Sequence, residues 1–551
     1  MPKACVACKR AGAARAASWC NLSAAPQPAL GDGDRDFMRN KTGSGKASHG
    51  AGLLPWRQLA PWLALLLIAA VLAAMWLLRV REPATPHPEQ PAIVVLPLHG
   101  AGNGGVGQTA LAESMSRELI ARLAHADGVR VVAWASSARA QAEKFDMAQL
   151  DERLHVSHAL AGTLRQADDH LLLELRLSSV PDGRMLWAQT YTRKREEMRT
   201  LEREAAEAIG QALGHKLQES EAQPENHPAL WLEYAAARHL LAARERTRGE
   251  DALRALLAHA PDYAPAQASL ARSRAAALRG GAVDTAELEA ITTAAGRALA
   301  ADKQLVDAHV ALAIVACRGT DWSACLDGFR QALTLDPADT EARVTYAYWL
   351  AGIGYVDRAL SEVETAWSAD PLNYDTNFAR ARLLDTRGKH DQALESLAAA
   401  SPPSPGLIYA RWHNAVWRHD LAAARDIAAA MPQSDGFRES YAGITEALSE
   451  PSRWPQIQPM IATSERANGH INTLRIMMPD ADYRLEIDGL ERMLRDSWPS
   501  YYLLLWMPEY AAMRRDPAFQ DFLQRTHILD YWRSAGFPTQ CHVSGDLAMC
   551  D

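Results

Sequence analysis

Three segments of equal length decide the fold of this chain: CLDGFRQALTLDP at 325–337, ALSEVETAWSADP at 359–371 and ALESLAAASPPSP at 393–405. Each begins with a small residue 34 positions after the last, has a larger apolar residue four positions on, and ends in proline. The recurring positions are the small residues Cys325, Ala359 and Ala393, the larger residues Phe329, Val363 and Leu397, the alanines Ala332, Ala366 and Ala400, the prolines Pro337, Pro371 and Pro405, and the glycines Gly354 and Gly388.

This period predicts a pair of antiparallel helices in each repeat. Small residues let two helices approach closely where they cross, and proline ends the second helix and starts the turn. A 34-residue helix–turn–helix period resembles the tetratricopeptide repeat. We expect such repeats over 228–405, followed at 406–551 by degenerate helical repeats and a capping tail. Stacked repeats present a surface that binds peptides or proteins, so a protein partner is expected, with a purely structural spacer as the alternative.

Residues 92–220 read differently, as strands and helices in the order βαβαβββα. The segments LAESMSRELIARLAHADGVRVV at 111–132 and LHVSHALAGTLRQADDHLLLELRLSSVPDGRMLWAQTY at 154–191 resemble the domain similar to the amino-terminal part of TolB. That domain recurs in bacterial proteins between a membrane span and tetratricopeptide repeats, including CadC-like winged-helix regulators and some class III nucleotide cyclases. The resemblance brings no catalytic residues to this part of the chain.

The stretch LAPWLALLLIAAVLAAMWLL, residues 59–78, holds 20 residues without a charge. About 20 apolar residues span a hydrocarbon core of about 30 Å, so we expect a transmembrane helix in contact with lipid. A cleaved signal peptide and a buried core helix are the alternatives. The 20 residues before this stretch hold four Lys or Arg, and the 20 after it hold two, Arg79 and Arg81. This bias predicts a short, disordered cytoplasmic tail over residues 1–58. A Pro-rich linker (82–91) would lead to a periplasmic bulk, which makes the chain a single-pass protein of the bacterial inner membrane.

Four cysteines on the predicted periplasmic side fall into two close pairs, Cys317 with Cys325 and Cys541 with Cys550. In an oxidising compartment such pairs form disulfides, and four unpaired thiols are the alternative.

Other motifs carry little chemistry. The sequence GNGGVG at 102–107 fits a dinucleotide-binding pattern, but the next strand ends without the acidic residue that would hold a ribose. GSGKA at 43–47 lacks the Ser or Thr that a P-loop needs, and Cys5, Cys8 and Cys20 with His49 show one tight ligand pair instead of two. We therefore expect no cofactor, no metal and no catalytic residues.

The fold class that follows is α/β plus all-α: one transmembrane helix, a small βαβαβββα domain, then an α-solenoid. Only 58 residues precede the span, too few for a winged helix, and the formal net charge is -8, so no direct nucleic-acid binding is predicted. The predicted function is a non-enzymatic, membrane-anchored interaction module, a sensor or scaffold, with a homo-oligomer left open. The alternative is the signal-input part of a transmembrane transcription regulator. Met38 is an alternative site at which translation of the chain could start.

Overall fold

The structure is a computed structural model. The residues that it describes are 91–100, 105–217, 228–278, 284–401, 404–431, 437–468, 481–496, 503 and 505–550. The predicted tail (1–58), membrane span (59–78) and all but the last residue of the linker lie outside the described residues. Among the helices that are described, none has both the length and the apolar character needed to cross a bilayer.

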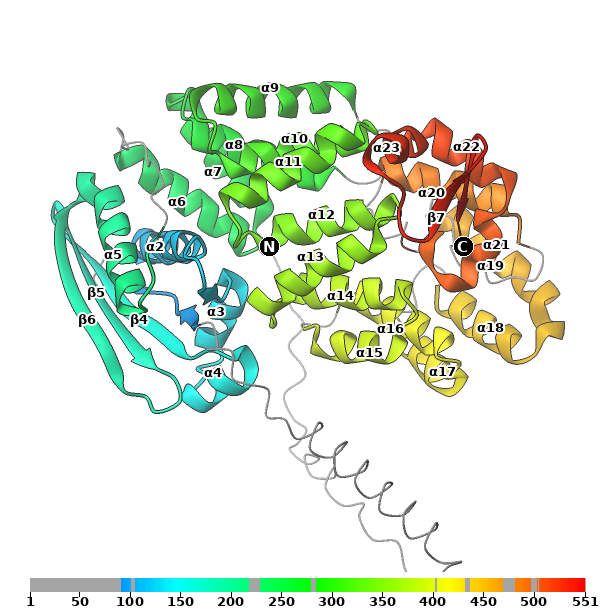
Figure 1. The fold of residues 1–551 in the computed structure, drawn as a ribbon, viewed down its shortest axis with the longest axis horizontal. Helices are drawn as coiled ribbons and strands as arrows, with labels where there is room; N and C mark the ends of the chain where they lie inside the picture. Colours follow the sequence, from blue (N-terminus) through cyan, green and yellow to red (C-terminus); the bar gives the residue numbers. More distant parts are fainter. Residues whose placement is uncertain are drawn as a thin grey trace, which may run out of the picture. The chain divides into compact units, whose positions relative to one another are not determined.

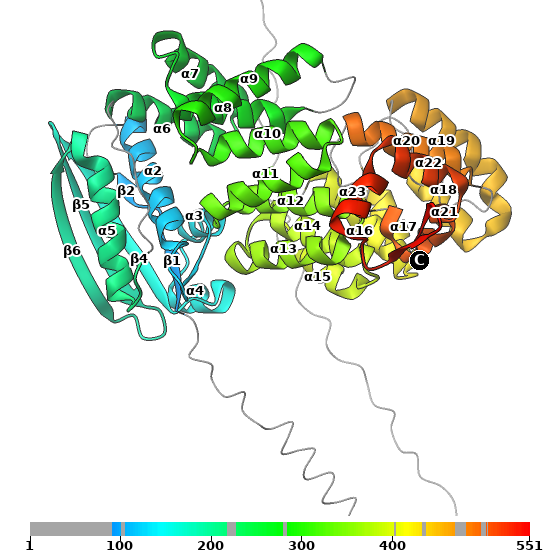
Figure 2. The same cartoon turned by 45° about the horizontal axis from the view of Figure 1, so that its top comes forward.

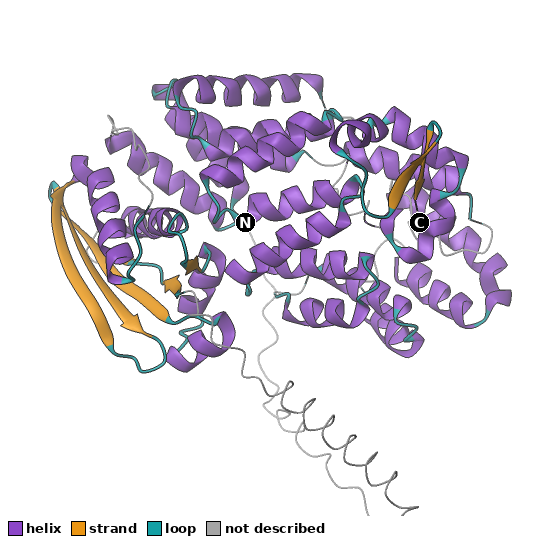
Figure 3. Ribbon diagram, in the orientation of Figure 1, coloured by secondary structure: helices purple, strands orange, loops and turns teal. Residues whose placement is uncertain are grey.

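Six strands form one mixed sheet, which confirms the predicted α/β domain in outline (Figures 1 and 3). The order along the sheet is β3-β1-β4-β5-β6. The short strand β2 pairs with β4 as well, on the same edge of β4 as β1. The pairings of β1 with β3 and β4, and of β2 with β4, are parallel, whereas β4, β5 and β6 are antiparallel. The strands are β1 (Ala92–Val95), β2 (His99–Gly100), β3 (Arg130–Val131), β4 (His158–Ala167), β5 (His170–Ser179) and β6 (Met185–Lys194).

Helices cover both faces of the sheet. Helices α2 (Gly105–Leu123) and α5 (Met198–Ala212) pack on the face to which β5 contributes Leu171, Leu173, Leu175 and Leu177. These leucines alternate along the strand, as expected when one face is buried. The opposite face of β1 packs against α3 (Trp134–Ala142) and α4 (Met147–Leu154). Helix α3 was not predicted; it begins at Trp134, shortly after β3 ends at Val131.

Consecutive helical hairpins follow the sheet, as the 34-residue period predicted (Figure 1). Their helices are α6 (Pro228–Ala242), α7 (Arg246–His259), α8 (Ala264–Ala277), α9 (Thr285–Ala301), α10 (Val306–Arg318), α11 (Trp322–Leu335), α12 (Thr340–Gly352), α13 (Val356–Ala369), α14 (Tyr374–Thr386), α15 (His390–Ala399), α16 (Pro405–Trp417) and α17 (Leu421–Ala430).

The recurring small and apolar residues lie in the hairpin cores. All are almost fully buried: Cys325, Phe329, Ala332, Ala359, Val363, Ala366, Ala393, Leu397 and Ala400. Pro337 and Pro371 follow a capping aspartate just after the second helix of their hairpins. Pro405 differs, since it begins α16, where its missing N–H costs nothing.

Two of the recurring glycines adopt backbone conformations that favour glycine. Gly354 and Gly388 have φ of 94° and 68° in the turns between the helices of their hairpins. At Gly354 a side chain would also meet Pro538 Cγ at 3.0 Å and Trp506 at 3.1 Å. Backbone conformation and close packing therefore both restrict this position to glycine.

The remaining elements continue the helical part and end in a β-hairpin, which was not predicted. They are α18 (Phe437–Ser449), η2 (Pro451–Arg453), α19 (Trp454–Asn468), α20 (Tyr483–Asp496), η5 (Pro508–Tyr510), α21 (Ala511–Arg514), α22 (Pro517–Arg525), α23 (Ile528–Ala535), β7 (Cys541–Ser544) and β8 (Leu547–Cys550). Disulfides join Cys317 to Cys325 and Cys541 to Cys550.

The carboxyl-terminal segment folds back onto the middle of the array, where α23 lies beside α11 and α12 (Figure 2). The indole N–H of Trp506 donates to the carbonyl oxygen of Gly352 at 3.1 Å, and that of Trp532 to Ile353 at 2.9 Å. In return, Trp322 of α11 donates to Thr526 at 2.7 Å. These bonds satisfy buried indoles and fix the segment on the turn after α12.

Asp370, in the turn after α13, joins the α/β domain to the array. Its fully buried carboxylate accepts hydrogen bonds from the backbone N–H of Ser136 at 2.7 Å and from the Ser136 hydroxyl at 2.5 Å. Thr340 and Asn373 donate to its other oxygen at 3.1 and 2.9 Å. Burial raises the pKa of Asp370, and these donors oppose that shift. One carboxylate thus connects the first turn of α3 with two repeats.

Candidate partner-binding site

The first helices of successive hairpins carry equivalent positions along one face of the array. The ninth residue after the N-cap is Arg272 in α8, Ile314 in α10, Tyr348 in α12, Arg382 in α14 and His413 in α16. We call these five residues the first-helix row. The 34-residue period does not reveal this row, because the longer loop after α8 places Arg272 and Ile314 42 residues apart.

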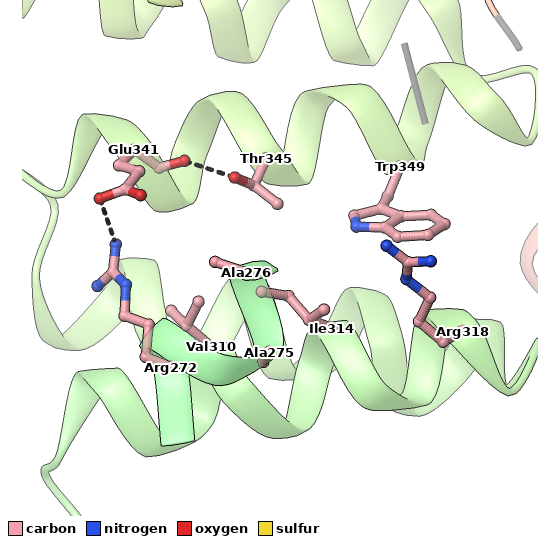
Figure 4. A pocket seen from close by; sticks show the side chains of 9 residues that line it. All are labelled: Arg272, Ala275, Ala276, Val310, Ile314, Arg318, Glu341, Thr345 and Trp349. Carbon is pink, nitrogen blue, oxygen red and sulfur yellow. Dashed lines mark hydrogen bonds and ion pairs between the residues drawn. The ribbon is translucent and has the colours of Figure 1, made fainter. Parts of the chain in front are cut away.

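A small groove, with about 40 Å³ of room for the centre of a water-sized molecule, lies at the α8–α12 end of the row (Figure 4). Its lining residues are Arg272, Ala275, Ala276, Val310, Ile314, Arg318, Glu341, Thr345 and Trp349. Its middle is apolar, with polar groups at both ends. At one end Glu341 meets Arg272, and at the other the Arg318 side chain extends toward the indole of Trp349.

Arg272 is neutralised by three carboxylates. It lies 3.0 Å from an oxygen of Asp307 and 3.0 Å from one of Asp339, which also caps α12. Glu341 is 3.4 Å away, and Arg238 pairs with Asp307 from the neighbouring helix α6. The network joins four hairpins, so it fixes their relative positions at this end of the row.

These contacts shift the pKa values of the carboxyl groups in opposite directions. Burial opposes ionisation of Asp307, but Arg238 and Arg272 hold its pKa below the ordinary value. The pKa of Asp339 is also lowered, because Arg272 outweighs its burial. Burial together with the charge of Asp339 raises the pKa of Asp336, which ends α11, to about 7; Arg272 opposes this shift only weakly.

Arg382, at the α14–α16 end, is in a different environment. It is 9% exposed, and its guanidinium lies 5.5 Å from the ring centroid of Trp417. Its Nη1 is buried without a hydrogen-bond partner, and it forms no ion pair with a carboxylate of the described residues. Burial and the charge of Arg382 lower the pKa of His413 to about 3, so the imidazole is neutral at ordinary pH.

The remaining motifs of the sequence lie mostly outside the described residues. The last glycines of the 102–107 motif, Gly105 and Gly107, belong to the first turn of α2, and the rest lies outside the described residues. Residues 43–47, Cys5, Cys8, Cys20 and His49 also lie outside them. In the described part of the chain, no group of three or more His, Cys, Asp or Glu side chains is placed to hold a metal ion.

Comparison with known proteins gives one distant curated relative. No protein-family model matches this chain. It is 26% identical over 288 residues to "Putative adenylate cyclase 3" of Rhizobium meliloti (strain 1021), over 50% of this chain and 43% of that protein. The chain thus spans less than half of the relative's length. This relative bears the name of an enzyme. It contradicts the prediction that the chain is non-enzymatic, and that prediction is withdrawn.

Two solved structures are similar to the helical part at low scores. A tetratricopeptide repeat protein from Parabacteroides merdae ATCC 43184 has 13% identity and a TM-score of 0.29, over 45% of this chain and 94% of that one. YrrB, described as a tetratricopeptide repeat protein with an unusual peptide-binding site, has 21% identity and a TM-score of 0.23, over 34% and 93%. At these scores, the description of this array rests on its own hairpins and their spacing.

Proposed function

We propose that this chain is a partner-binding module that works in a signalling protein, with the groove between α8 and α12 taking an apolar side chain of a protein partner. The observation that carries this proposal is the groove itself, an apolar floor between two charged ends on the first-helix face. Binding grooves of proteins are commonly apolar with a few polar groups that fix orientation.

The lining residues suggest how a segment would be held. An apolar side chain of the partner would contact Val310 and Ile314, and the edge of the Trp349 indole would add aromatic contact area, which often dominates such interfaces. The Glu341 side chain is 76% exposed, so it would accept hydrogen bonds from the partner or form an ion pair with a cation on it. The groove would therefore select for an apolar residue followed by a donor or a cation.

A photo-crosslinking amino acid at position 345 tests this use of the groove. In the full chain expressed in its own cells, it should give a discrete crosslinked protein. The control is the same amino acid at position 330, where the arginine side chain is 58% exposed on a second helix. Equal products from both positions, or none from position 345, would contradict the proposal.

The membrane anchorage and periplasmic location remain part of the proposal. They are supported by the uncharged stretch 59–78 and by the two disulfides, since disulfides persist mainly in oxidising compartments. A reporter that is active only in the cytoplasm, fused after residue 551, should be inactive. Activity of that reporter would rule out a periplasmic carboxyl terminus.

The distant relative supports a role in cyclic-nucleotide signalling, and some class III nucleotide cyclases carry the same predicted order of domains. We expect cells that express the chain to contain altered cyclic AMP levels, either through the chain's own turnover of ATP or through a cyclase that it binds. Purified full-length chain incubated with ATP and a divalent cation separates the two. Cyclic AMP from the purified chain supports its own activity, and a change seen only in cells supports a bound cyclase. Unchanged cyclic AMP in both assays would remove this role.

A further inference from the structure

We propose that the outer edge of strand β6 is a dimerisation surface, on which β6 of a second copy of this chain adds as an antiparallel strand around a two-fold axis at Thr190. The inference goes beyond the function proposed above, because it concerns how copies of the chain assemble. In the described part of the chain, β6 ends the sheet and pairs only with β5. Figures 1 and 2 show this strand at the rim of the α/β domain.

The backbone of β6 presents alternate N–H and C=O groups along this edge. The backbone N–H of Arg195, just after β6, donates to the carbonyl oxygen of Asp169 on the β5 side at 2.9 Å. Because these groups alternate in direction along an antiparallel strand, odd-numbered residues of β6 bond toward β5 and even-numbered ones, Thr190 among them, face outward.

The middle of β6 carries none of the usual protection of a sheet edge. Proteins commonly protect an exposed edge with proline, with charged side chains or with a β-bulge. The sequence AQTYT at 188–192 has no proline and no charge. The register shift between β5 and β6 lies near Met185, outside this stretch. An added strand can therefore pair along the whole middle of β6.

An open polar hollow lies between β6 and α5, beside the same edge. It has about 490 Å³ of room for the centre of a water-sized molecule. Its lining residues are Gln189, Thr190, Tyr191, Thr192 and Arg193 of β6 and Glu204, Glu207, Ala208 and Gln211 of α5. A strand that pairs with a sheet edge next to a helix places alternate side chains in such a hollow.

The Tyr191 hydroxyl group supplies a buried donor to this hollow. Tyr191 is 6% exposed, and its hydroxyl oxygen is buried without a hydrogen-bond partner among the described residues. Burial and the charge of Glu204 raise the pKa of Tyr191, so the hydroxyl keeps its proton. A buried donor without a partner is costly, so an acceptor on an added strand would stabilise the pairing.

A second β6 strand supplies that acceptor on both sides of a two-fold axis. When Thr190 pairs with Thr190 of the second copy, Tyr191 lies beside Gln189 of the second copy, on the same face of the sheet. The amide oxygen of Gln189 can accept from the Tyr191 hydroxyl. In the same register Trp187 lies beside Arg193 of the second copy, and a guanidinium is attracted to the face of an indole. Each contact occurs twice, as a two-fold interface requires.

The two ends of β6 also favour an antiparallel copy. Arg193 and Lys194 make one end cationic, whereas Met185 and Leu186 at the other end are 61% and 37% exposed. Antiparallel pairing keeps the two cationic ends apart, and it lays the carbon chain of Lys194 along Leu186 of the second copy. A parallel copy would bring the two cationic ends together.

Cysteine crosslinking tests the register. Full chain with Cys5→Ser, Cys8→Ser and Cys20→Ser carries either Thr190→Cys or the matched control Thr192→Cys, and cells that express it are treated with copper phenanthroline. Across the axis, two residues at position 190 have Cα atoms about 5.5 Å apart, within disulfide reach, whereas two at position 192 are more than about 10 Å apart. We expect a disulfide-linked dimer from Thr190→Cys and about tenfold less from Thr192→Cys. Equal dimer from both variants, or none from Thr190→Cys, would overturn the proposal.

Other variants separate pairing from folding. Full chain purified in detergent micelles should form dimers in analytical ultracentrifugation. Thr190→Pro removes an N–H that faces the edge, so it should abolish the dimer, whereas Thr190→Val keeps that N–H and should dimerise like the unchanged chain. Tyr191→Phe should raise the dimer dissociation constant by about fivefold or more, because two hydrogen bonds are lost in each dimer, whereas a merely structural role would leave this constant unchanged.

Circular dichroism and urea unfolding verify that each of these variants is folded. A monomeric unchanged chain, or a folded Thr190→Pro variant that dimerises with unchanged affinity, would reject the pairing. If Thr190→Pro does not fold, unchanged affinity of a folded Tyr191→Phe variant rejects the pairing by itself.

Discussion

Arg272 and Arg382 occupy the same position in two hairpins of one array, yet one lies among three carboxylates and the other against aromatic rings. At the α8–α12 end, charges inside the chain balance one another and tie neighbouring hairpins together. At the α14–α16 end, a positive charge has been buried without a carboxylate of the described residues to balance it. The difference teaches that the same position of a repeat can hold an ion-pair network in one hairpin and an arginine packed on an aromatic ring in another.

The largest loss of stability is expected when Arg272, at the α8–α12 end of the row, is replaced by an uncharged residue. Arg272→Met would leave Asp339 buried without its principal partner and Asp307 with Arg238 alone. Breaking a buried ion pair on one side typically costs about 3 kcal/mol or more. Urea unfolding of the full chain should show this loss in the free energy of unfolding.

The control for that variant is Arg330→Met, which breaks the exposed pair with Asp327, whose two side chains are 58% and 62% exposed. Exposed pairs contribute about 0–1 kcal/mol, so the control should be nearly neutral. Equal losses in both variants would mean that the network around Arg272 is not a special source of stability.

A second, smaller effect is a dependence of stability on pH at the same end. The pKa of Asp336 rises from 3.8 to about 7, so between these pH values the folded chain keeps a proton that the unfolded chain releases. The free energy of unfolding should therefore fall as pH rises from about 4 to 7, by up to about 3 kcal/mol. Below that range the slope should reverse, because the lowered pKa values of Asp307 and Asp339 make their contribution disappear as pH falls.

Asp336→Asn isolates this group, since asparagine resembles the protonated acid. The fall in stability between pH 4 and 7 should become shallower in the variant, as measured by urea unfolding at several pH values. If the slope persists unchanged, another group is responsible for it.

The smallest change in stability is expected when Arg382, at the α14–α16 end of the row, is replaced. Arg382→Met removes a buried charge that has no ion pair among the described residues, and methionine keeps much of the side-chain volume. Replacing buried charges with apolar groups of similar size is often neutral or stabilising. The free energy of unfolding should change by less than about 1 kcal/mol, or rise. A loss as large as that of Arg272→Met would erase the difference between the two ends.

Sequence patterns predict the repeated hairpins and the mixed sheet because both depend on local periodicity. Small residues such as Ala359 and Ala366 recur at fixed spacing, and the leucines of β5 alternate, so their burial can be read without coordinates. Helix α3 escaped prediction because its sequence, WASSARAQA, continues directly from an apolar strand and lacks a strong N-cap side chain.

The first-helix row could not be predicted in the same way. The bonds of Arg272 to Asp307 and Asp339 span 35 and 67 residues, and no local pattern marks which acid an arginine will meet. That Arg382 forms no ion pair among the described residues is harder still to predict, because it depends on all the elements packed around it. Counting from each N-cap would have revealed the row once helix starts were known.

The indole bonds between the carboxyl-terminal segment and the middle of the array have a consequence for biosynthesis. Gly352 and Ile353 leave the ribosome more than 150 residues before Trp506 and Trp532, whose indoles later bond to them. Repeat arrays can ordinarily consolidate hairpin by hairpin as the chain emerges. Here the turn after α12 gains these indole bonds only after more than 150 further residues have been made, so it lacks them throughout that part of synthesis.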